Sequence, residues 1–182
     1  ETAILYNYER QEPTGIYENG QTYLPVSWIN DHINERFYWD STENLLVYAL
    51  PDQIVYADAE TKGSNGAPLL VVKDDEVYLT LGLIANYTDV QIQTFDSGDG
   101  KRVLINDWGT RNTARVKKAG SLRVKGGVKS KVLTDLAKDD TVTVLDTMEK
   151  WSRVASSDGN IGYVENKRLA AAESRKFSGN FK

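Results

Sequence analysis

The chain has 182 residues, of which 40% are apolar and 26% charged, with a formal net charge of −4. This composition is that of an ordinary folded protein of one or two domains. With no cysteine and one histidine, the chain lacks the residues for thiol catalysis, cysteine-ligated zinc or a copper site of several imidazoles. No apolar run approaches the ~18 residues of a membrane-spanning helix, so we expect no transmembrane segment.

The charge is divided unevenly along the chain. Residues 1–108 carry 18 acidic and 6 basic side chains, a formal charge of −12, whereas residues 109–182 carry 8 acidic and 16 basic ones, a charge of +8. This asymmetry predicts two domains and indicates an anionic partner for the basic part. Nucleic acid, teichoic acid and an acidic lipid surface all fit on charge alone, and so does an ordinary solvated surface.

An internal repeat organises the first hundred residues. Tyr23–Ile29 aligns with Tyr78–Ile84. Each copy, about residues 15–60 and 69–107, predicts a hairpin with a polar turn, a short helix and two more strands. The polar turn is Glu18-Asn19-Gly20 in the first copy and Asp74-Asp75 in the second. We therefore expect two ββαββ units that pack together, because a unit this short buries its own apolar face poorly.

The helices and strands of each copy are predicted from the spacing of apolar residues. Apolar side chains at positions i, i+3 and i+7 predict a helix near Val26–Ile33, with its counterpart near Leu81–Tyr87. The apolar runs Leu45–Tyr48 and Val103–Ile105 are typical of strands. The segment Asp96–Gly100 loosely follows a calcium-binding loop, but its spacing fails, and a hairpin turn explains it better.

The first copy carries Tyr23-Leu24-Pro25-Val26 before its helix and Tyr38-Trp39-Asp40 after it. This order resembles the copper amine oxidase N-terminal-like domain, and the resemblance covers about residues 15–107. The second copy departs from the pattern, with Thr80 in place of the proline and Thr94 in place of the tryptophan. Despite the family's name, the resemblance implies no copper, and we expect neither a metal nor a cofactor.

Residues 114–170 predict a small all-β barrel. Short strands separated by turns run from Leu122-Arg123-Val124 to Gly162-Tyr163-Val164, and closure of such strands removes exposed edges. The order of these elements resembles a bacterial SH3 domain, whose members usually sit beside an enzyme and hold it to a cell wall. The family's opening turn commonly reads Leu-Asn-Val-Arg-x-Gly-Pro, whereas Leu122–Val128 lacks the Asn and the Pro.

Six residues of the barrel are candidates for ligand binding. Trp151 and Tyr163 offer ring faces suited to the apolar face of a sugar, and the alternative for both is packing in the barrel core. Four cations that lie close in sequence are expected to form a basic rim or, alternatively, an ordinary solvated face: Arg123, Lys125, Lys129 and Lys131.

The sequence contains no recognisable catalytic constellation. The single histidine, His32, lies on the predicted helix of the first copy, where we expect it to be solvated or to cap the helix rather than join a Ser-His-Asp triad. The basic half lacks an RNA-recognition aromatic signature, and the acidic half repels phosphate. We therefore expect no enzymatic activity in this chain and no nucleic acid as a partner.

The two resemblances together predict the organisation of the chain. We expect an α+β repeat module of two ββαββ units over residues 1–110, an all-β SH3-like small barrel over 114–170, and a linker to a downstream domain over 171–182. This order resembles the N-terminal region of secreted Firmicutes family 18 (chitinase-like) glycoside hydrolases. The resemblance implies a segment of a longer, processed Gram-positive protein that is extracellular or associated with the cell wall.

The function implied by the resemblance is non-catalytic targeting. The chain is expected to bind peptidoglycan or teichoic acid beside the C-terminal catalytic domain of the same polypeptide. The alternative is a structural module that packs on that catalytic domain or mediates self-association.

Overall fold

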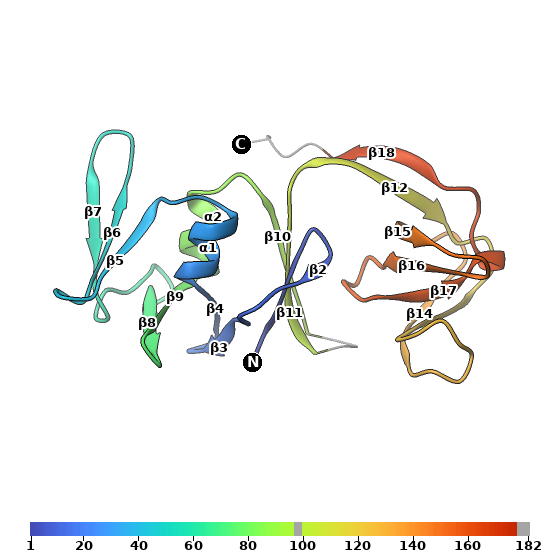
Figure 1. Cartoon of the computed structure of the whole chain (residues 1–182), viewed down its shortest axis with the longest axis horizontal. Helices are drawn as coiled ribbons and strands as arrows, with labels where there is room; N and C mark the ends of the chain where they lie inside the picture. Colours follow the sequence, from blue (N-terminus) through green and yellow to red (C-terminus); the bar gives the residue numbers. More distant parts are fainter. Residues whose placement is uncertain (97–99, 178–182) are drawn as a thin grey trace. The chain divides into compact units, whose positions relative to one another are not determined.

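The computed structural model describes residues 1–96 and 100–177, and strands make up 52% of it against 9% for helices. The chain divides into two compact units. The N-terminal unit comprises Glu1–Ile4 and Arg10–Asp89, and the C-terminal unit comprises Leu5–Glu9 and the chain from Val90 onward. Figure 1 shows the strands and helices of both units in sequence colours.

One antiparallel sheet of the N-terminal unit joins the two sequence copies, in the order β3-β4-β9-β8. Its strands are Ile16–Glu18 (β3), Gln21–Pro25 (β4), Leu70–Lys73 (β8) and Glu76–Thr80 (β9). Asn19 and Gly20 join β3 to β4, and Asp74 and Asp75 join β8 to β9, all four with φ between 50° and 69°. Two residues with positive φ form the tight hairpin turn that matches strand twist, so both predicted hairpin turns are confirmed.

The second sheet of this unit has three strands in the order β5-β6-β7. These are Phe37–Asp40 (β5), Leu45–Ala49 (β6) and Ile54–Ala57 (β7). Side chains alternate across the sheet, and one face is buried through Phe37, Leu46, Tyr48 and Ala57.

The two α-helices of the described residues lie where the apolar spacing predicts them. They are α1 (Val26–His32) and α2 (Leu81–Asn86), of seven and six residues. α1 buries Val26, Trp28 and Ile29, while α2 buries Leu83 and Ile84. Among the residues that the structure describes, no helix has the length and apolar character needed to cross a membrane.

The expected pair of α+β ββαββ units is wrong, because the chain is mostly β and its strands are shared among several sheets. The first hairpins of the two copies merge into one sheet through pairing of Tyr23 with Thr80 and Leu24 with Leu79. The strands after each helix lie in different sheets. The physical reason is that an isolated two-stranded hairpin is marginal and leaves unpaired backbone groups, which the β4–β9 pairing satisfies.

A four-stranded sheet has the order β10-β11-β1-β2. Its strands are Gln91–Asp96 (β10), Lys101–Asn106 (β11), Ala3–Tyr6 (β1) and Glu9–Arg10 (β2). β10 and β11 pair in antiparallel register from Gln91 opposite Asn106 to Asp96 opposite Lys101. The weak calcium-loop pattern at Asp96–Gly100 falls largely on residues 97–99, which lie outside the described residues.

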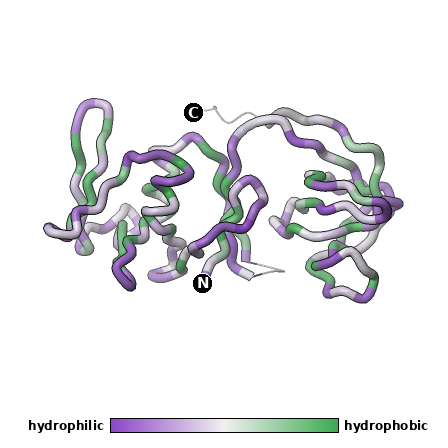
Figure 2. Tube along the Cα trace, in the orientation of Figure 1, coloured by the Kyte–Doolittle hydropathy of each residue, from purple (hydrophilic) through white to green (hydrophobic). Residues whose placement is uncertain are grey.

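The remaining strands form one sheet in the order β14-β13-β17-β16-β15-β12-β18. Their bounds are Gly109–Arg115 (β12), Gly120–Arg123 (β13), Val132–Leu136 (β14), Thr141–Thr147 (β15), Trp151–Ala155 (β16), Ile161–Glu165 (β17) and Glu173–Phe177 (β18). Apolar and polar segments alternate along these strands (Figure 2). A common buried core draws on every strand from β12 to β17, as in a small barrel: Ala114, Val116, Leu122, Leu136, Val142, Val154 and Val164.

The last strand, β18, lies within the range expected to be a linker. It pairs with β12, from Gly109 opposite Phe177 to Thr113 opposite Glu173. Residues 178–182 lie outside the described part of the chain, and the linker role of residues 171–182 stays a prediction.

Hydrogen bonds from Arg102 link β11 to the turn between β16 and β17. Its side chain is 2% exposed, and its Nε and Nη2 donate to the carbonyl oxygens of Gly159 (2.7 Å) and Asp158 (3.0 Å). Nη1 donates to the Gly100 carbonyl at 2.6 Å. Gly159 has φ +77°, and a Cβ there would collide with the Phe95 ring, so both the turn and its contact with β10 require glycine.

We predict that Arg102→Ala lowers the free energy of unfolding of the C-terminal unit by about 3 kcal/mol, because buried carbonyl oxygens lose charged hydrogen-bond donors. The matched control is Lys101→Ala, whose exposed ion pair with Asp96 contributes about 0–1 kcal/mol. Urea unfolding followed by tryptophan fluorescence checks both values. Equal losses in the two variants would contradict an anchoring role for Arg102.

Candidate ligand-binding groove

An open groove lies over β16 and β17 on the outer face of the barrel. Its volume is ≈ 620 Å³, within the range of ligand-binding clefts. Two loops and two strands line it: Lys125, Gly126, Met148, Glu149, Lys150, Trp151 and Tyr163.

The aromatic floor of this groove follows from strand alternation. Trp151 stands opposite Glu165 in the β16–β17 ladder, which makes Tyr163 its diagonal neighbour on the same face. Both rings are half-buried and stand outside the buried core, whereas the alternating positions Val154 and Val164 point into it. The two rings therefore present surface to solvent. The core-packing alternative required them to fill the barrel, and they do not.

The loop between β13 and β14 forms one wall. Its ends are joined by a bond from the Val124 N–H to the Lys131 carbonyl (2.9 Å). The Ser130 hydroxyl donates toward the carbonyl oxygens of Lys125 (2.8 Å) and Gly127 (2.7 Å). A Cβ at Gly126 would lie 3.2 Å from Cγ of Trp151, so the absence of a side chain lets the loop backbone pack against the indole.

The turn between β15 and β16 forms the opposite wall, and Asn166 holds it. The Asn166 side-chain amide donates to the Met148 carbonyl (2.7 Å), and its backbone N–H donates to the Lys150 carbonyl (2.9 Å). The buried Ser152 hydroxyl in turn donates to Asn166 Oδ1 (2.5 Å). Both walls are thus fixed by hydrogen bonds within the barrel, so the groove is largely formed before any ligand arrives.

The sequence of this barrel matches a known family. Residues 118–170 match the model of the bacterial SH3 domain. The chain contains a bacterial SH3 domain. No curated protein and no solved structure matches the chain. Bacterial SH3 domains are commonly involved in cell-wall binding, which is consistent with a targeting role.

The SH3 domain brings three of the six sequence candidates together, since Lys125, Trp151 and Tyr163 all line the groove. Arg123 lies opposite Tyr163 in the β13–β17 pairing, and its Nη1 donates to the Ser130 carbonyl at 2.8 Å. Lys129 and Lys131 are exposed in the same loop but do not line the groove. Ligand binding by these six residues stays a prediction.

Sequence reasoning missed the residues contributed by the β15–β16 turn, Met148 to Lys150, and the positioning residue Asn166. No motif marks them, because their role depends on a turn and a short 3-10 helix (Asn166–Arg168) meeting in space. One signal in the sequence could have found the turn residues. A turn that directly precedes a predicted surface aromatic, here Trp151, lies beside that aromatic at the end of its strand.

The histidine of the sequence has a local role. His32 ends α1, where its ring stacks on Trp28 with centroids 4.7 Å apart. Its Nδ1 lies 3.0 Å from the Trp28 carbonyl oxygen. Among residues 1–96 and 100–177, no three His, Asp or Glu side chains are grouped to hold a metal ion.

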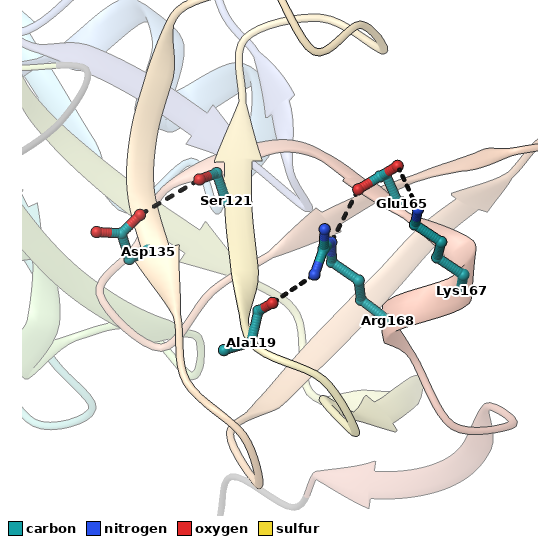
Figure 3. Close-up of polar contacts among 6 residues, drawn as sticks. All are labelled: Ala119, Ser121, Asp135, Glu165, Lys167 and Arg168. Atoms are coloured by element: carbon teal, nitrogen blue, oxygen red, sulfur yellow. Dashed lines mark hydrogen bonds and ion pairs between the residues drawn. The ribbon is translucent and has the colours of Figure 1, made fainter.

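A polar cluster ties the end of β17 to the start of β13 in the SH3 domain (Figure 3). Arg168 Nε donates to Glu165 Oε1 (2.8 Å), and Arg168 Nη1 donates to the Ala119 carbonyl. Lys167 Nζ lies 3.5 Å from Glu165 Oε2. The hydrogen bond from Arg168 stabilises the ionised carboxylate and lowers the pKa of Glu165 below its ordinary value of 4.5. A side chain at Gly120 would collide with Arg168, so the cluster also requires glycine there.

We predict that this cluster makes the SH3 domain sensitive to acid. Because the pKa of Glu165 is lower in the folded state, its contribution to stability is complete above about pH 4.5 and is lost as pH falls through the folded pKa. Glu165→Gln should lower stability at pH 7 and flatten its decline below pH 5. Urea midpoints at pH 3 to 7 check this, and a variant with an unchanged decline contradicts it.

Proposed function

We propose that this chain is the non-catalytic, wall-targeting region of a longer secreted bacterial protein, and that the groove of the SH3 domain makes the contact. One observation carries the proposal. A domain of a family that commonly binds cell walls exposes two aromatic rings, Trp151 and Tyr163, beside two lysines, Lys125 and Lys150, in one preformed groove.

The rings and the lysines of the groove each suit a component of a cell wall. The rings of Trp151 and Tyr163 offer apolar faces for stacking on a pyranose or for packing against a peptide stem. The ammonium groups of Lys125 and Lys150 attract phosphate or carboxylate groups of anionic wall polymers. The formal charge of +8 on residues 109–182 speeds encounter with such polymers at low salt.

The proposal extends to the protein that carries this chain. The Tyr23-Leu24-Pro25-Val26 and Tyr38-Trp39-Asp40 motifs support a copper amine oxidase N-terminal-like module ahead of the SH3 domain. That order supports a parent enzyme of the family 18, chitinase-like glycoside hydrolases, outside the cell of a Gram-positive bacterium. Holding such an enzyme on the wall raises the local concentration of its substrate, because the second binding event becomes intramolecular.

We predict that Lys125→Glu/Lys150→Glu releases the chain from the wall at moderate salt. The measurement is co-sedimentation with Gram-positive peptidoglycan, with and without teichoic acid, across a salt series. The charge reversal should lower retention about tenfold or more and flatten its salt dependence, since two attractive contacts become repulsive. The matched control, Lys129→Glu/Lys131→Glu, makes the same change of charge in the β13–β14 loop, which also carries Lys125, but outside the groove lining.

The pattern of retention identifies the ligand. A larger loss in the groove variant than in the loop variant supports a localised site, and equal losses indicate diffuse attraction by the whole basic half. Salt-resistant retention on bare peptidoglycan, abolished by Trp151→Ala, assigns recognition to the aromatic floor. No retention of the wild-type chain under any condition overturns the proposal.

A further inference from the structure

The outward face of the β5–β6–β7 sheet is apolar where a solvated sheet face is ordinarily polar. Tyr38 is 64% exposed, Tyr56 59% and Ile54 59%. Leu45, Val47 and Ala49 of the central strand share this face because they alternate with the buried Leu46 and Tyr48. An exposed apolar face of this kind marks an interaction surface.

The two tyrosines stand in one row across the sheet. Tyr38 is opposite Val47 in the β5–β6 ladder, and Val47 is opposite Tyr56 in the β6–β7 ladder. Opposed residues project from the same face, and two strand spacings place Tyr38 and Tyr56 about 10 Å apart. The smaller Val47 lies between them, so the two rings flank a shallow strip.

This arrangement fits an extended β-1,4-linked pyranose chain. In such a chain alternate rings present the same face, and the distance between them is the length of one disaccharide, close to the spacing of the two tyrosines. The axial C–H groups of a pyranose ring pack on the electron-rich face of an aromatic ring. The phenolic hydroxyls supply hydrogen bonds at the edge of the same strip.

The charge of the segment that carries the face selects among wall polymers. Residues 36–60 contain five acidic side chains, Asp40, Glu43, Asp52, Asp58 and Glu60, and one basic one. That cation, Arg36, donates through Nη1 to the Ala49 carbonyl (2.7 Å) and lies over the Tyr87 ring at 5.8 Å. The carboxylates therefore repel phosphate-rich polymers, and an uncharged ligand meets no such penalty.

We propose that the Tyr38–Val47–Tyr56 row is a second carbohydrate-binding surface, and that it takes neutral β-1,4-linked glycan strands. It is complementary in charge to the SH3 groove: the groove with its two lysines suits anionic components, and the row, carried by an acidic segment, suits uncharged ones. The surface stands on its own contacts and is independent of whether the groove binds the wall.

The test uses the full chain and two neutral β-1,4-linked glycans, insoluble chitin and cellulose, in depletion assays, with soluble chitohexaose in titration calorimetry. Binding to at least one of them is expected, with little change between low and high salt. Tyr38→Thr and Tyr56→Thr should each weaken it by about 2- to 10-fold. Threonine preserves the preference for a strand, so circular dichroism should remain unchanged.

Three control variants keep the result specific. Tyr38→Phe retains the ring and loses only the hydroxyl, so it should weaken binding less than Tyr38→Thr does. Tyr17→Thr removes a tyrosine that is 46% exposed on β3 of another sheet and should have no effect. Trp151→Ala disables the SH3 groove and should leave binding to these glycans intact, which separates this surface from the proposed wall-binding function.

Three results overturn the proposal. The first is absence of binding to chitin, cellulose and chitohexaose. The second is unchanged binding by the Tyr38→Thr/Tyr56→Thr double variant. The third is a wild-type dimer in sedimentation velocity that this double variant converts to a monomer without altering glycan binding, which assigns the face to a second copy of the chain.

Discussion

Pairing between strands that are distant in the sequence is the constraint on which this structure depends. Its strands are short, helices α1 and α2 have seven and six residues, and the chain has no cysteine from which a disulfide could form. The backbone N–H and C=O groups at the edges of each hairpin must therefore pair with strands from other parts of the chain. β4 pairs with β9 of the other sequence copy, and β12 pairs with both β15 and β18. The cores then form where these pairings bring apolar faces together.

The same constraint explains why the candidate binding surfaces lie on sheets and not in a deep cleft. Once the inward positions of β16 and β17 are committed to the SH3 core, the outward positions are free for Trp151 and Tyr163. The loops beside them need rigidity, and they obtain it from hydrogen bonds of Ser130 and Asn166 to loop carbonyls. Rigid walls reduce the entropy lost when a ligand binds.

Local signals in the sequence predicted local structure well. The Asn19-Gly20 and Asp74-Asp75 turns, the positions of α1 and α2, and the SH3 strands followed from turn chemistry and apolar periodicity. The choice of partner strand did not, because nothing within Tyr23–Pro25 specifies β9 in preference to a partner in its own copy. That choice is made by the burial of whole faces, and it overturned the expectation of two self-contained ββαββ units.

The candidate sites were predictable to different degrees for related reasons. Trp151-Ser152-Arg153-Val154 alternates, so the sequence showed which side chains share a face. It did not show which of the two faces points inward, because that depends on the core of the folded domain. Phe37-Tyr38-Trp39-Asp40 begins with three aromatic residues in succession. Because apolar and polar residues do not alternate there, the sequence could not show which side of the strand faces solvent. Only the ladders with β6 and β7 set Tyr38 and Tyr56 outward in one row.

The pairing of β18 with β12 also has a mechanical consequence. Phe177 stands opposite Gly109, so the strands that precede and follow the SH3 domain are neighbours, and Gly109 and Phe177 lie at the same end of their ladder. A pulling force between these two points acts across the ladder and opens its hydrogen bonds one after another, instead of shearing them all together. The buried core draws its side chains from β12 to β17, so β18 can peel away under load while the groove keeps its shape.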